Sequence, residues 1–162
     1  MDVDTYIHDE VTRQKSTDFG GFRAAMLAAK NSRVGFDLDS WTTFAAFVCS
    51  LAYNVDRTMN TYHSGTTLHN LRRSHVGFMD GGTAAPAVEV PERFNRWCVL
   101  TYPLLEPGVE LTGGEIDFII KQLLQIHPWL DGNGRTASIL RNWMLGTLDD
   151  PTPLPYYFGQ EN

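Results

Sequence analysis

The chain has 162 residues and a mass of 18.2 kDa, which fits one domain of ordinary size and leaves little room for two. Hydrophobic residues make up 43% of the chain and charged residues 20%, near the averages of globular proteins, which argues against bulk disorder. The formal net charge of −6 makes it a poor general binder of nucleic acid, because neutralising phosphates needs an excess of cations. We therefore expect no direct nucleic-acid partner.

Neither a membrane span nor a signal peptide is predicted. The longest uncharged stretch, residues 40–55, is shorter and more polar than a bilayer span, and residues 1–10 are acidic and lack an apolar segment. Cys49 and Cys98, the two cysteines of the chain, sit among apolar residues, so we expect buried free thiols in place of a disulfide. These features predict a protein of the cytoplasm, of its own cell or of a host, with no membrane partner.

The spacing of apolar residues is mostly helical. Helices are predicted over residues 22–30, 41–56, 91–104, 115–126 and 135–145. Asp39 or Ser40 would cap the second of these helices and Thr112 the fourth, while Pro91 begins the third. The pattern therefore favours an all-α fold.

Two segments break the helical pattern. Residues 73–90 mix extended residues around the turn Met79-Asp80-Gly81-Gly82, which predicts a β-hairpin. Prolines recur in residues 149–162, so this tail should be irregular or extended. We expect a mainly α-helical domain with one small β-hairpin.

Residues 127–135 read His-Pro-Trp-Leu-Asp-Gly-Asn-Gly-Arg and join the last two predicted helices. Pro128 should end the first of these helices at His127, because a residue before proline avoids helical geometry. The ring of His127 follows the buried stripe of Leu123 and Leu124, which aims it at one end of the core. This placement makes His127 a candidate base.

The rest of this loop has the residues of a phosphate site. Gly132 and Gly134 allow backbone turns at positive φ, so that successive N–H groups point the same way at the start of a helix, where an anion is favoured. Asp131 offers a hard oxygen ligand for Mg²⁺, and Arg135 a partner for a phosphate. Each feature alone is more common in an ordinary helix–helix connection, but their combination in one short loop indicates phosphate chemistry.

Over these residues the sequence resembles the Fic (filamentation induced by cAMP) domain family of the Fic/Doc superfamily. The family signature is His-Pro-Phe-x-Asp/Glu-Gly-Asn-Gly/Lys-Arg-x-x-Arg, and the resemblance extends over about residues 65–157. It implies a single mainly α-helical domain with the following parts: N-terminal helices over 1–60, a core over 65–150, a flap over 73–90 and an irregular tail over 151–162, together 1–162.

The resemblance implies a transferase that moves part of a nucleotide or phosphorylated donor to a Tyr, Thr or Ser hydroxyl of a target protein. The commonest case is AMPylation with ATP and Mg²⁺. The implied roles are a general base for His127, a Mg²⁺ ligand for Asp131, donor and anion binding for Gly132, Asn133, Gly134 and Arg135, and strand-like pairing with the target for the flap residues Val76, Gly77 and Phe78.

The chain departs from the signature at two positions. Trp129 stands for phenylalanine, which keeps a large apolar anchor, whereas Ser138 stands for the second arginine and supplies no cation for the γ-phosphate. Arg141 lies too far along the helix to replace that arginine and reads as a solvated charge. Gly134 stands where the kinase-like members carry lysine, which favours nucleotidyl transfer.

Several alternatives therefore stay open. The donor could supply a phosphoryl, UMP, GMP or phosphocholine group, or the chain could be a non-catalytic Fic-fold module that binds a partner or a nucleotide. The family's inhibitory motif ends in Glu-Gly or Glu-Asn, and the only such dipeptide here is Glu161-Asn162, with no room for a helix before it. We expect no inhibition of that type within this chain, and restraint from a separate antitoxin or regulatory region.

Overall fold

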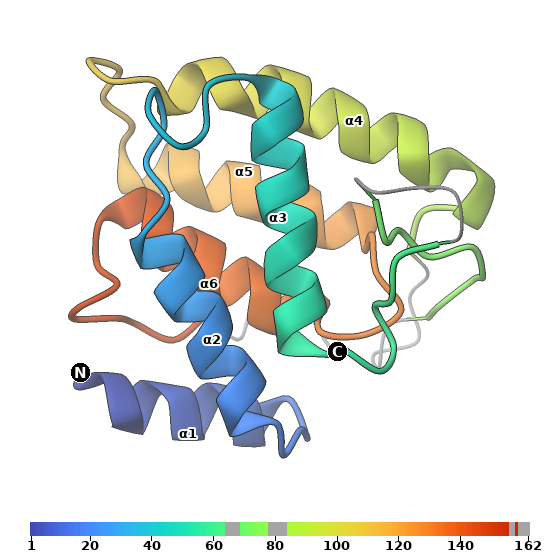
Figure 1. Ribbon diagram of the computed structural model, residues 1–162, viewed down its shortest axis with the longest axis horizontal. Helices are drawn as coiled ribbons and strands as arrows, with labels where there is room; N and C mark the ends of the chain where they lie inside the picture. The colour runs from blue at the N-terminus through green and yellow to red at the C-terminus, as the bar shows by residue number, and fades with distance from the viewer. Residues whose placement is uncertain (64–68, 78–83, 156–157, 159–162) are drawn as a thin grey trace.

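The computed structural model describes residues 1–63, 69–77, 84–155 and 158. These residues contain six α-helices: α1 (Val3–Arg13), α2 (Phe19–Lys30), α3 (Trp41–Val55), α4 (Val90–Thr101), α5 (Gly113–Ile126) and α6 (Asn133–Leu145) (Figure 1). Two short 3₁₀ helices, Ala87–Glu89 and Tyr102–Leu105, flank α4. The five helices predicted from apolar spacing are confirmed with shifted ends, whereas α1 was not predicted from that spacing and falls in the range 1–60, where the resemblance implies N-terminal helices.

Helix α3 runs through the middle of the molecule and packs against α2, α4 and α6 (Figure 1). Helices α5 and α6 lie side by side, and α4 covers α5 on the side away from the N-terminus. Helix α1 packs against both α2 and α6, so the first residues of the chain lie on the last helix. The loop between α5 and α6 ends up beside the C-terminal end of α3.

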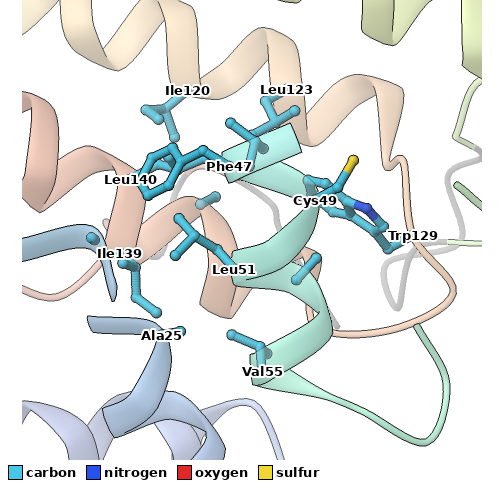
Figure 2. Close-up of a cluster of buried hydrophobic side chains, with 14 of the residues drawn as sticks. Ala25, Phe47, Cys49, Leu51, Val55, Ile120, Leu123, Trp129, Ile139 and Leu140 are labelled. Atoms are coloured by element: carbon cyan, nitrogen blue, oxygen red, sulfur yellow. The ribbon is translucent and has the colours of Figure 1, made fainter. Parts of the chain in front are cut away.

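The core forms where α3 meets α6. Figure 2 shows Phe47 and Leu51 of α3 facing Leu140 and Ile139 of α6, and all of these side chains are buried. Their burial supplies most of the driving force for this packing, because removing apolar surface from water is the dominant favourable contribution to folding. Cys49 and Cys98 are buried and free, as predicted. Among the described residues, no helix is long and apolar enough to cross a membrane.

The ends of the helices that carry the loop are set by local sequence. Ser40 and Thr43 form a capping box at the start of α3, and Thr112 and Glu115 form one at the start of α5. Helix α6 has Gly132 as its N-cap, so no side chain caps its first backbone N–H groups. That uncapped end faces the loop with the signature.

The predicted β-hairpin is not seen among the described residues. No β-strand occurs in residues 1–63, 69–77 or 84–155. Val88 lies in a 3₁₀ helix and Val90 begins α4, because Pro91 has the fixed φ of a first helical turn and commits the backbone to helix. The turn Met79-Asp80-Gly81-Gly82 and the flap residue Phe78 lie outside the described residues.

Candidate active site

His127 ends helix α5. Its backbone is left-handed, with φ 53° and ψ 64°, and its N–H donates to the Leu123 carbonyl oxygen at 3.0 Å. Pro128 follows it, so the prediction that the helix ends here is confirmed. The side chain of His127 is 0% exposed, and it lies at the end of the buried stripe of α5.

The surroundings of His127 keep its imidazole neutral. Burial and, to a smaller extent, the positive charge of Arg72 together lower the pKa of His127 from 6.5 to about 4, against a hydrogen bond with the Leu124 backbone that raises it. At neutral pH the ring therefore carries one proton and keeps a lone pair that can accept another. That is the protonation state that a general base needs.

Arg72 binds backbone carbonyl groups at the C-terminal end of α5. Its guanidinium is 1% exposed and donates to four backbone carbonyl oxygens, those of Ile126 (3.1 Å), His127 (2.5 Å), Ser74 (2.9 Å) and Ala85 (2.6 Å). A cation at a helix C-terminus also complements the helix dipole. Nothing in the local sequence around Arg72 indicates that it is buried.

Hydrogen bonds between Asn133 and Trp129 also hold the loop together, without help from Arg72. The Asn133 side chain accepts from the Trp129 backbone N–H at 3.0 Å and donates to the Trp129 carbonyl oxygen at 2.8 Å. The Trp129 indole N–H donates to the Asn70 side chain at 2.9 Å, and its ring stands against Cys49 of α3 (Figure 2). Trp129 therefore anchors the loop by a hydrogen bond that phenylalanine could not make.

The loop is also fixed to the end of α3. The Asn60 amide donates to the carbonyl oxygens of Ala52 (2.9 Å) and Asp131 (2.8 Å). Gly132 has φ 74°, and a Cβ there would lie 2.7 Å from Cγ1 of the buried Val55. Only glycine suits both the backbone and the space at this position. The predicted positive φ is thus found at Gly132, but Gly134 lies inside α6 and does not have one.

Asp131 in the loop and Arg135 in the first turn of α6 form an ion pair. The Arg135 Nη2 lies 3.1 Å from Oδ2 of Asp131, with the arginine side chain 2% exposed and the aspartate 32% exposed. The pair crosses one turn of backbone from the loop into α6. It places a carboxylate next to solvent and a buried guanidinium behind it.

Asp56, just after α3, adds a second carboxylate beside Asp131. Its Oδ1 accepts the backbone N–H groups of Thr58 (3.1 Å) and Met59 (3.0 Å), which orients the group. Burial raises the pKa of Asp56, and the adjacent Asp131 side chain raises it further. Two hard oxygen donors that repel each other fit a divalent cation such as Mg²⁺, which would relieve the repulsion.

The Fic/DOC family model matches residues 115–145, which span α5, the loop and α6. The likeness to the Fic/DOC family lies in this segment. The resemblance seen in the signature is confirmed over these residues. No curated protein and no solved structure matches the chain.

The position of the second arginine in the Fic/DOC signature is covered by α1. Ser138 is fully buried there, and its Oγ lies 2.6 Å from the Tyr6 hydroxyl, which also accepts from the Asn142 side chain at 3.3 Å. A longer side chain at 138 has no room while α1 is in place. Arg141 is no substitute, because its guanidinium donates to Asp117 of α5 at 2.8 Å.

The structure brings most of the predicted Fic/DOC site together. His127, Asp131, Gly132, Asn133, Gly134 and Arg135 lie in one loop and the first turn of α6. Val76 and Gly77 lie outside any helix, in the described segment 69–77, where Arg72 donates its backbone N–H to the Pro128 carbonyl oxygen at 2.8 Å. Asp56, Asn60, Asn70 and Arg72 were missed as parts of the site, since lone polar residues outside the motif carry no local signal.

Proposed function

We propose that this protein is a Fic-type transferase that moves a nucleotidyl group, AMP from ATP in the first instance, onto a Tyr, Thr or Ser hydroxyl of a target protein. The observation that carries the proposal is a buried His127 with a pKa of about 4, held at one end of a loop whose other end supplies Asp131 and the uncapped start of α6. A neutral base and an anion-binding helix end are what this transfer requires.

In the proposed reaction, a ring nitrogen of His127 takes the proton of the target hydroxyl. The hydroxyl oxygen then forms a bond to the α-phosphorus, the bond from that phosphorus to the bridging oxygen breaks, and pyrophosphate leaves with the electron pair. The first backbone N–H groups of α6 and the Arg135 guanidinium would stabilise the negative charge that develops on the phosphoryl oxygens. Asp131, with Asp56 beside it, would hold Mg²⁺, which neutralises donor phosphates when it is bound.

The test is a transfer assay read by intact mass. Wild type, His127→Ala and the exposed control His8→Ala are incubated with Mg²⁺, a cell lysate and ATP, GTP, UTP, CTP or CDP-choline in turn. We expect an adduct whose mass identifies the group moved, a rate lower by about 10²–10⁴-fold in His127→Ala, and an unchanged rate in His8→Ala. Equal rates in all three proteins would remove His127 from the reaction.

A non-catalytic binding module is the second candidate function. The observation that favours it concerns Ser138, which stands where the family signature has a cation. Ser138 is buried and in contact with the Tyr6 hydroxyl of α1. If no donor yields an adduct while Mg²⁺ and a nucleotide still bind, the module is favoured. The choice of AMP over another transferred group rests on the same assay.

A further inference from the structure

The start of α6 is covered by a side chain from the far end of the sequence. Gln14 is the C-cap of α1, and its amide lies directly over Gly134. A Cβ built on Gly134 would lie 2.3 Å from the Gln14 Oε1 and 2.6 Å from its Nε2. The missing side chain at 134 therefore leaves the space that the Gln14 amide fills.

This amide is a poor occupant of the space. Neither the Oε1 nor the Nε2 of Gln14 has a hydrogen-bond partner among the described residues, although both atoms are buried. Burying an amide without partners costs free energy, because its bonds to water are lost and not replaced. Helix α6 also has no side-chain cap, so the amide lies on a helix end without satisfying it.

Ser16, two residues after Gln14, contacts Arg135. The Ser16 Oγ accepts from Nη1 of Arg135 at 2.9 Å, while Nη2 pairs with Asp131. The Nε of this 2% exposed arginine has no partner among the described residues. Between Gln14 and Ser16, Lys15 has φ 58°, a backbone conformation that is uncommon for a residue with a side chain.

We propose that residues 14–16 form an anion-gating strap, in which Gln14 occupies the place of a donor phosphate at the start of α6 and is displaced when that phosphate binds. The inference rests on the proposed function for the identity of the donor. A phosphate bound at the start of α6 would accept from the first N–H groups of the helix, whereas the buried Gln14 amide makes no hydrogen bond there. The released amide regains its hydrogen bonds in water.

Replacing a residue that binds the donor would weaken pyrophosphate binding, whereas replacing Gln14 of the strap should strengthen it. The first experiment measures this difference. The dissociation constant for inorganic pyrophosphate with Mg²⁺ is determined by calorimetry for wild type, Gln14→Ala and Gln14→Glu. Removing the amide should tighten binding about tenfold. Gln14→Glu should weaken it, because a carboxylate is a stronger competitor at a helix N-terminus.

A matched control and a stability measurement accompany it. Gln122→Ala, on the exposed face of α5, should leave pyrophosphate binding unchanged. The melting temperature of Gln14→Ala without ligand should equal or exceed that of wild type, since the amide makes no hydrogen bond. Unchanged or weaker pyrophosphate binding in Gln14→Ala would overturn the strap.

A second experiment follows the displacement itself. In Gln14→Cys, the new thiol should react slowly with a maleimide in the free protein and faster at saturating pyrophosphate, against a low background from the buried Cys49 and Cys98. A rate that falls or stays the same on adding pyrophosphate contradicts displacement. Tighter pyrophosphate binding in Gln14→Ala with no adduct from any donor would uphold the strap and reject the transferase, and transfer without these effects would do the reverse.

Discussion

The carbonyl oxygen of His127 accepts a hydrogen bond from the Nε of Arg72 at 2.5 Å, although 55 positions separate the two residues. The same guanidinium also lowers the pKa of the His127 ring through its charge. One buried arginine thus fixes the backbone of the candidate base and helps to keep its side chain neutral. The segment before the predicted flap is for this reason part of the site's support.

Replacing Arg72 should destabilise the whole fold. Arg72→Met leaves the carbonyl oxygens of Ile126, His127, Ser74 and Ala85 without this donor, so we expect a loss of about 3 kcal/mol in the free energy of unfolding. The exposed neighbour is the control, and Arg73→Met should stay within about 0.5 kcal/mol of wild type. Urea unfolding measures both, and a similar small loss in the two variants would contradict the supporting role.

Stability should fall in acid because of His127. The unfolded chain binds a proton at His127 below pH 6.5, whereas the folded protein does so only near pH 4. The free energy that neutral His127 contributes is therefore present above pH 6.5 and is lost as the pH falls towards 4. Between pH 7 and pH 5 we expect the free energy of unfolding to drop by about 2 kcal/mol from this group.

His127→Gln isolates this contribution. Burial also lowers the pKa of His69, and that of Asp56 is raised, so other groups change the pH dependence too. These groups are present in both proteins. The difference between wild type and variant in the free energy of unfolding, measured with urea at each pH, therefore gives the effect of His127. Parallel pH dependences would show that the ring is not buried in its neutral form.

The two glycines of the motif should tolerate alanine to different degrees. Gly132→Ala combines a positive φ with a Cβ 2.7 Å from the buried Val55, and we expect a loss of about 2 kcal/mol. Gly134→Ala keeps helical geometry and meets only the flexible end of Gln14, so its free energy of unfolding should change by less than about 1 kcal/mol. Thermal or urea unfolding compares the two, and equal losses would contradict the geometry at 132.

Mg²⁺ should stabilise the protein through the carboxylate pair. Adding Mg²⁺ is expected to raise the melting temperature of wild type, and EDTA to reverse it, because binding to the folded state alone shifts the equilibrium. Asp131→Asn and Asp56→Asn should each reduce the shift, while Asp9→Asn, on the exposed face of α1, should not. Without Mg²⁺, Asp56→Asn should melt at or above the wild-type temperature, since it removes a carboxylate whose pKa is raised by burial first and by the adjacent Asp131 second.

Local sequence determined a large part of this molecule. The capping residues Ser40 and Thr112 and the apolar periodicity define α3 and α5, because these signals act within one or two turns of backbone. The loop of residues 127–135 could likewise be predicted from its sequence, since Pro128 ends α5 and Gly132 adopts the positive φ that precedes α6. The same local reasoning failed at Val88 and Val90, which were included in the predicted hairpin of residues 73–90, although Pro91 lies in the first turn of a helix.

Tertiary structure alone decided what surrounds that motif. The sequence places no signal on Gln14, Asp56 or Arg72 that points to the loop, and the contact of Tyr6 with Ser138 joins residues 132 positions apart. Such contacts arise from how amphipathic helices pack, and helix packing is set by the summed burial of many side chains. The functional groups of the loop therefore follow from consecutive residues of the sequence. The burial of the loop, the protonation state of His127 and the cover by α1 are properties of the folded chain.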